Sequence, residues 1–220
     1  MLRATGVGAG DEVVVPAFGN PEVAQAVSLT GAVPVFADIE PATYCLDASA
    51  VEAAVTSRTV AVVVVHRFGR SADIEALHQV GERNGLLVLE QGESEAPYGE
   101  LGERRQRAAY LSVKLKGVRT PEDCGGHTFQ QYVVRVPGNG RPDRDAFARA
   151  VRTKGVECSV PVRTPVHRMP GFRRDVYLPE TERAADETLA LPIGGDMSRR
   201  ELQRLVAACN ALGGLLQPAF

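Results

Sequence analysis

The chain has 220 residues, of which 44% are hydrophobic and 24% are charged, so it can bury a substantial core and is not expected to be disordered. Its formal net charge of -2 lacks the basic excess that is typical of nucleic-acid-binding proteins. Its longest apolar run, Val60–Val65, is too short to span a membrane, and the N-terminus has no apolar core of the signal-peptide kind, which predicts a cytoplasmic protein.

The N-terminal part of the chain alternates between short apolar runs and helical patterns. The runs rich in β-branched residues predict strands at Asp11–Pro16, Val33–Ala37, Thr59–Val65 and Leu86–Glu90. Apolar residues at helical spacing predict intervening helices at Pro21–Thr30, Ala48–Val55 and Ile74–Asn84. This alternation is typical of βαβ units and predicts a mostly parallel sheet covered by helices.

The rest of the chain follows a different order. We expect helices at Glu103–Lys116, Asp143–Lys154, Thr181–Leu189 and Ser198–Leu212, and strands at Thr128–Val136 and Val156–Val160. Such an order makes a small α+β layer. We therefore expect an α/β protein with a truncated large domain over residues 1–102, followed by a connecting helix and a small C-terminal α+β domain over residues 103–220.

The cysteines give no sign of a disulfide framework or a metal site. Cys45, Cys124, Cys158 and Cys209 lie far apart and form no C-x-x-C pair, so we expect reduced thiols. Cys124 and His127 flank a glycine-rich turn, but two ligands without a second pair are more often part of an ordinary loop. No metal is expected.

Four stretches carry a family resemblance. GVGAGDEVVVP at residues 6–16 and HRFGRSADIEAL at residues 66–77, together with YVVRVPGNGRPDRDAF and PVHRMPGF further on, closely resemble sugar aminotransferases of the DegT/StrS type. These enzymes use pyridoxal phosphate (PLP). The resemblance implies a PLP-transferase-like, three-layer large domain with a mostly parallel sheet, and a small C-terminal domain.

The chain departs from the family where the cofactor chemistry should lie. LLVLEQGESEAPYGE at residues 86–100 runs almost directly into ERRQRAAYLSVKLKG at residues 103–117, and the resemblance implies that a segment carrying the cofactor lysine is missing between them. Gln91 stands where the family has the acid that pairs with the pyridine nitrogen. Gln91 and Ser94 are therefore expected to be vestigial cofactor positions, and Asn20 replaces the stacking aromatic. No catalytic residue is assigned and no bound cofactor is expected.

The remaining candidates are weaker. Lys114, Lys116 and Lys154 are the only lysines, and we expect them to be solvated surface residues. His66 matches a family histidine and is expected to order the loop that follows it.

Two further groups of side chains are candidates. Glu90, Glu93 and Glu95 lie close in sequence and could supply paired carboxylates. Neighbouring acids at the end of a strand are commonly solvated surface residues. The loop at residues 165–172 resembles one that borders the family's sugar-nucleotide site. We therefore take His167 and Arg168 as candidate substrate-binding residues, with nearby arginines that suit a phosphate or carboxylate at Arg163, Arg173 and Arg174.

Three functions stay open. The first is a degenerate, catalytically inactive homologue that serves as a partner or binding protein, with a nucleotide sugar as candidate ligand. The second is an active sugar aminotransferase completed by a surviving lysine or by a full-length partner. The third is a non-enzymatic regulatory or scaffold protein. Because loss of later strands leaves a sheet edge unpaired, we also expect a homo-oligomer or a heteromer with a full-length homologue, and expect the uncharged run Thr59–Val65 to favour pairing.

Overall fold

The computed structural model describes residues 5–92, 101–122, 126–137, 144–194 and 197–213. The chain divides into two compact units, each discontinuous in sequence. The first contains Met1–Glu93 and Thr164–Ala185, and the second contains Ser94–Arg163 and Asp186–Phe220. None of the helices in the described part of the chain combines the length and apolar character needed to cross a bilayer.

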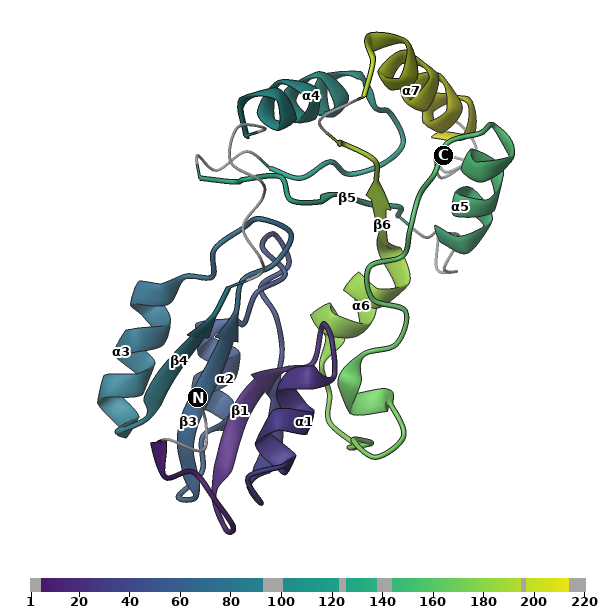
Figure 1. Cartoon of the computed structure of the whole chain (residues 1–220). Helices are drawn as coiled ribbons and strands as arrows, with labels where there is room; N and C mark the ends of the chain where they lie inside the picture. Colours follow the sequence, from purple (N-terminus) through teal and green to yellow (C-terminus); the bar gives the residue numbers. More distant parts are fainter. Residues whose placement is uncertain (1–4, 93–100, 123–125, 138–143, 195–196, 214–220) are drawn as a thin grey trace, which may run out of the picture. The chain divides into compact units, whose positions relative to one another are not determined.

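The first unit is built on a four-stranded parallel sheet (Figure 1). Its strands, in the order β2-β1-β3-β4, are β2 (Val33–Ala37), β1 (Glu12–Pro16), β3 (Thr59–Val65) and β4 (Leu87–Gln91). Three helices connect them, namely α1 (Glu22–Ser28), α2 (Ala48–Ala54) and α3 (Ile74–Asn84). The parallel sheet predicted from the sequence is thus confirmed.

Alternate residues along β1 pack into two different cores. Val13 and Val15 belong to the cluster that includes Val27 of α1, whereas Val14 belongs to the cluster that includes Leu77 of α3. Side chains of a strand alternate between the two faces of a sheet, so helices cover both faces. The result is the three-layer arrangement that the sequence predicts.

One expectation about the sheet is wrong. The sequence predicts that the uncharged run Thr59–Val65 favours pairing with another chain, but β3 pairs with β1 on one side and with β4 on the other. An uncharged, β-branched run is what a fully flanked central strand requires. The two edges of the sheet are instead β2 and β4, in which Val33 and Leu87 are 44% and 45% exposed.

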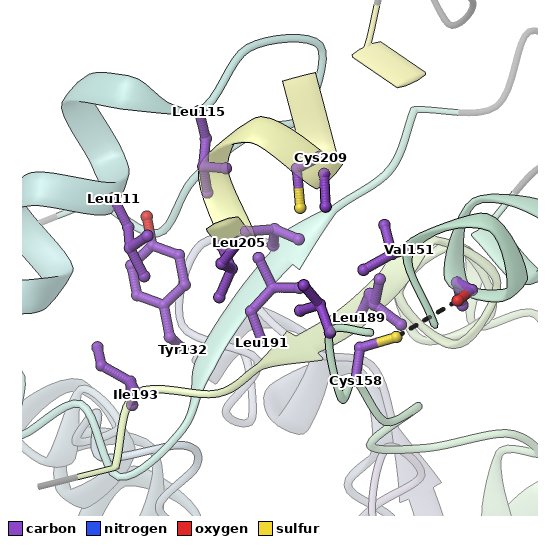
Figure 2. Packing of buried hydrophobic residues seen from close by; sticks show 14 of the residues in the cluster. Leu111, Leu115, Tyr132, Val151, Cys158, Leu189, Leu191, Ile193, Leu205 and Cys209 are labelled. Carbon is purple, nitrogen blue, oxygen red and sulfur yellow. Dashed lines mark hydrogen bonds between the residues drawn. The ribbon is translucent and has the colours of Figure 1, made fainter. Parts of the chain in front are cut away.

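The second unit pairs two antiparallel strands with three helices. β5 (Tyr132–Arg135) runs against β6 (Thr188–Leu191), and the helices are α4 (Leu101–Lys114), α5 (Arg144–Thr153) and α7 (Arg199–Gly213). Figure 2 shows the core between them, where Tyr132 and Leu191 of the strands point toward side chains of the helices such as Leu111 and Leu205. As predicted, the Thr128–Val136 region stays outside the large parallel sheet.

Two local predictions in this region differ from the structure. The strand expected at Val156–Val160 is reduced to one bridge between Ser159 and Ala190. The helix expected at Thr181–Leu189 is α6 (Pro179–Glu187), and the chain then enters β6 at once. Apolar residues at the end of a helical pattern also suit a buried strand, and the pairing partner decides between the two.

The division into units also differs from the expected boundary. The sequence predicts one connecting helix and C-terminal domain over residues 103–220, whereas Thr164–Ala185 groups with the N-terminal unit. The backbone N–H of Val166 donates to the carbonyl of Ala17 at 2.9 Å. The ring of His167 lies 6.3 Å from that of Phe36. These contacts link the returning segment to the ends of β1 and β2.

Candidate functional site

The carboxyl edge of the parallel sheet is where ligands bind in open α/β folds, and here it carries an aromatic cluster. Phe18 follows β1, Phe68 follows β3, and Tyr44 lies in the connection between β2 and α2. Phe18 stacks on Tyr44 with ring centroids 5.7 Å apart, and Phe68 meets Tyr44 edge-on at 5.4 Å. All three are buried, so this edge is packed with protein side chains.

Arg67 completes this cluster. Its guanidinium lies 5.9 Å from the ring centre of Phe18 and 5.7 Å from that of Phe68, and Nη2 donates to the carbonyl of Phe18 at 3.1 Å. A β-carbon added to Gly19 would collide with this guanidinium. Gly19 therefore provides the space that Arg67 fills. The sequence gives no specific signal for this role, because Gly19 lies three residues beyond the end of β1 and a glycine in a loop does not by itself indicate which side chain approaches it.

The other side chains at this edge are paired with each other. Nδ1 of His66 accepts the backbone N–H of Ala72 at 3.1 Å, so His66 orders its loop as expected from the sequence. Nε2 of His66 and Nε2 of His78 lie 3.6 Å and 3.7 Å from the two carboxylate oxygens of Glu90. The carbonyl of Gln91 accepts the backbone N–H of His66 at 3.2 Å. Gln91 is the last residue of β4 and is exposed.

The lysines are remote from these residues in the chain and lie in the other unit. The N-terminal unit contains none, whereas Lys114, Lys116 and Lys154 belong to the second unit and are exposed. Asn210 of α7 accepts the N–H of Lys116 and donates to the carbonyl of Lys114, each at 2.8 Å. The expectation that they are surface lysines agrees with this placement.

The two candidate substrate residues, His167 and Arg168, lie together on Glu182. Nε2 of His167 is 3.2 Å from Oε1 of Glu182, and Nε of Arg168 donates to the same oxygen at 2.9 Å. Hydrogen bonds from Arg168, and then from His167, hold the pKa of Glu182 below its ordinary value. His167 is fully buried. Both side chains therefore stabilise the segment that carries them.

The neighbouring arginines are the other candidate substrate-binding residues. Arg173 and Arg174 are exposed, and Arg174 donates through Nη1 to the carbonyl of Arg173. Arg163 belongs to the second unit. The sequence does not identify Glu182 as the partner of His167 and Arg168, because no local pattern links Arg168 to a carboxylate fourteen residues away.

The second unit contains a separate hollow of about 370 Å³ beside β6. Its lining includes Arg104 of α4, Gln130, Glu157, Ser159 and the backbone that follows β6. Nη1 of Arg104 donates to the carbonyls of Phe129 and Gln130 at 3.4 Å and 3.2 Å. Through these hydrogen bonds Arg104 holds the segment that leads into β5.

A metal centre is not present among the described side chains, since no three His, Cys, Asp or Glu residues there are arranged to hold an ion. Of the predicted weak pair, Cys124 lies outside the described residues. His127 stacks on Phe129 with ring centroids 3.9 Å apart. Ser94, Glu93 and Glu95 also lie outside the described residues, so the vestigial role of Ser94 stays a prediction.

Comparison with known families gives a clear match. The model of the DegT/DnrJ/EryC1/StrS aminotransferase family matches residues 1–92 and 99–210. The break between the two matched segments, at residues 93–98, lies within the stretch 86–100, a few residues before the join expected from the sequence.

Individual relatives extend this result. A pleiotropic regulatory protein from Geobacillus stearothermophilus is 28% identical over 299 residues, covering 93% of this chain and 79% of the relative. Because this chain has 220 residues, the relative carries residues in the aligned region that have no counterpart here. An L-glutamine:2-deoxy-scyllo-inosose aminotransferase from Streptomyces lividus is 42% identical over 153 residues. That match covers 68% of this chain and only 33% of the relative.

Solved structures show the same fold. NtdA from Bacillus subtilis, solved with bound cofactor PMP, superposes with a TM-score of 0.86 at 19% identity, covering 97% of this chain and 70% of NtdA. PLP, the aldehyde form of this cofactor, is held through a lysine amine and reacts with the help of an acid beside its pyridine nitrogen. In this chain the N-terminal unit has no lysine, and β4 ends in the neutral Gln91.

Proposed function

The chain belongs to the DegT/DnrJ/EryC1/StrS aminotransferase family, and from this premise we propose that it is a catalytically inactive member that acts as a binding or partner protein. The observation that carries the proposal is the placement of its lysines. All three are exposed in the second unit. The unit with the parallel sheet therefore offers no amine to hold PLP, and we propose that the chain binds none.

The neutral side chain at the end of β4 supports the same proposal. PLP acts as an electron sink when an acidic side chain keeps its pyridine nitrogen protonated. A carboxylate favours that protonated form by its charge, and an amide such as that of Gln91 does not. The adjacent acid, Glu90, is already shared by His66 and His78. Loss of ring protonation would add to the loss of the lysine.

One observation favours a regulatory role over other forms of binding. The relative with the broadest match among those compared above is named a pleiotropic regulatory protein, whereas the inosose aminotransferase matches over a third of its own length. A role of this kind needs the fold and its surfaces but no cofactor. The nucleotide-sugar ligand predicted for His167 and Arg168 stays a prediction, since both side chains are engaged by Glu182.

Cofactor binding provides the decisive experiment. The purified chain is mixed with PLP, and the aldimine absorbance band is sought before and after borohydride. Amino transfer from L-glutamine to 2-deoxy-scyllo-inosose is assayed in parallel. We expect no aldimine band and no product. A band or turnover that disappears in one of Lys114→Ala, Lys116→Ala or Lys154→Ala would instead support an active enzyme that uses a surviving lysine.

A mixing experiment separates the remaining alternative. If an intact homologue gains turnover on addition of this chain beyond its own activity, and the gain follows complex formation, the chain completes a shared active site. We expect complex formation, where it occurs, to leave the turnover of each intact subunit unchanged.

A further inference from the structure

The two edges of the parallel sheet are protected unequally. At one edge, Val33 of β2 donates its N–H to Asp11 at 2.9 Å, so the backbone groups of Val33 and Val35 face β1, and those of Pro34 and Phe36 face outward. Pro34 has no N–H, and a proline at this position discourages another strand from pairing. The edge formed by β2 is therefore blocked.

The other edge, formed by β4, has no such protection. The carbonyl of Gln91 accepts the N–H of His66, the residue that follows β3, so Leu87, Leu89 and Gln91 direct their backbone groups to β3. Val88 and Glu90 direct theirs outward. Within the described parts of the chain, no hydrogen bond reaches these outward groups. The strand contains neither proline nor lysine, and its residues are exposed or half-buried.

We propose that β4 pairs with β4 of a second copy of this chain, antiparallel and centred on Leu89, which joins the two sheets into one. In this arrangement Val88 of each copy lies opposite Glu90 of the other. Their outward N–H and carbonyl groups form the hydrogen-bonded pairs of an antiparallel ladder. The two Leu89 side chains meet in the non-hydrogen-bonded position on the face that packs with Val13 and Val15.

The sequence of β4 selects this register over its neighbours. A pair centred on Glu90 would place two carboxylates directly opposite each other, which is unfavourable. A pair centred on Val88 would need the N–H of Leu86, which already donates to the carbonyl of Gly81 at 2.8 Å. Centring on Leu89 uses both free backbone positions and places Glu90 opposite an apolar residue. The edge is thus self-complementary, which favours a second copy over an unrelated partner.

The interface is expected to be weak. A ladder of five residues per copy is smaller than a standard stable interface, so the dimer should form and dissociate with concentration. Sedimentation velocity of the full chain over a wide concentration range should show a monomer–dimer equilibrium. A monomer at every concentration would overturn the proposal.

Cross-linking tests the register itself. In a Cys124→Ser background, Leu89→Cys places two thiols opposite each other at a distance that suits a disulfide. Leu87→Cys is the matched control, because the two copies of residue 87 would lie four residue steps apart, about 13 Å. We expect a disulfide dimer with Leu89→Cys and little with Leu87→Cys. Equal cross-linking of the two variants would contradict the proposed register.

A substitution at the outward edge gives an independent test. Val88→Pro removes one outward N–H while leaving every bond from β4 to β3 in place, and Val88→Ala trims the side chain but keeps the N–H. We expect Val88→Pro to weaken dimerisation at least tenfold relative to Val88→Ala. Unchanged association in a folded Val88→Pro protein would exclude pairing through β4. If Val88→Pro does not fold, the pair of cysteine variants still decides the question.

Discussion

Oδ1 of Asp38 accepts a hydrogen bond of 2.8 Å from the backbone N–H of Thr181, which lies 143 residues further along the chain. Its other oxygen accepts the N–H of Glu180 at 3.0 Å. The first N–H groups of a helix have no partner within the helix, so Asp38 caps the start of α6 from the end of β2. This contact fastens the segment 164–185 to the N-terminal unit.

Removal of this cap should loosen that segment. We expect Asp38→Ala to lower the free energy of unfolding by about 1–2 kcal/mol, as for other lost helix caps, and to speed amide exchange near Thr181. Asp47→Ala is the matched control, because Asp47 caps α2 by accepting the N–H of Ala50 at 2.9 Å. The control should destabilise by a similar amount without faster exchange at residues 164–185.

The packing of Arg67 against Gly19 can be tested by a double-mutant cycle. A methyl group at residue 19 would collide with the guanidinium, so Gly19→Ala should displace the end of Arg67 from its hydrogen bond to Phe18, at a cost of about 0.5–1.5 kcal/mol. The same substitution in an Arg67→Ala background should cost less, because the collision is gone. Urea unfolding of the four proteins measures the coupling; additive effects would mean that Arg67 does not fill this space.

Acid should weaken the contacts of Glu182. Hydrogen bonds from Arg168 and His167 hold its pKa below the ordinary value of 4.5. A group whose pKa is lower in the folded state stabilises the fold above its unfolded pKa, and that contribution is lost as the pH falls through the folded pKa. The stability difference between wild type and Glu182→Gln should therefore shrink as the pH falls below about 4.5.

Arg168→Met provides the control for this titration. It removes the larger cause of the lowered pKa, so the pH at which Glu182 stops stabilising the fold should move up toward the ordinary value. Urea unfolding measured across the acid range follows both variants. A constant difference between wild type and Glu182→Gln at all pH values would show that the charge of Glu182 does not matter.

Removing the buried hydroxyl of Tyr132 and removing its hydrogen-bond partner should destabilise the fold by different amounts. It lies 2.8 Å from Oγ of Ser112, and burial raises the pKa of Tyr132 to about 12. Tyr132→Phe removes one hydrogen bond and should cost about 1 kcal/mol. Ser112→Ala leaves the buried hydroxyl unpaired and should cost more, about 1–3 kcal/mol. Thermal and urea unfolding rank the two variants, and the reverse order would contradict this pairing.

The sequence by itself determined the local elements of the N-terminal unit. The strands predicted at Val33–Ala37 and Thr59–Val65 are β2 and β3 with the same bounds, and α3 covers the predicted helix Ile74–Asn84. These elements follow from the period of their apolar residues, which is a local property. The family resemblance was likewise carried by contiguous motifs, and the match to the family model confirms it.

Only the tertiary structure decided which elements meet. No local pattern places β3 between β1 and β4, sends the segment 164–185 back to the N-terminal unit, or turns Thr188 and Leu189 from predicted helix into strand. Each of these outcomes depends on partners distant in sequence. The same holds for the candidate site, where Arg67 fills the space beside Gly19 and Glu182 binds His167. The energies of such contacts depend on pairs of residues, and a single stretch of sequence contains only one member of each pair.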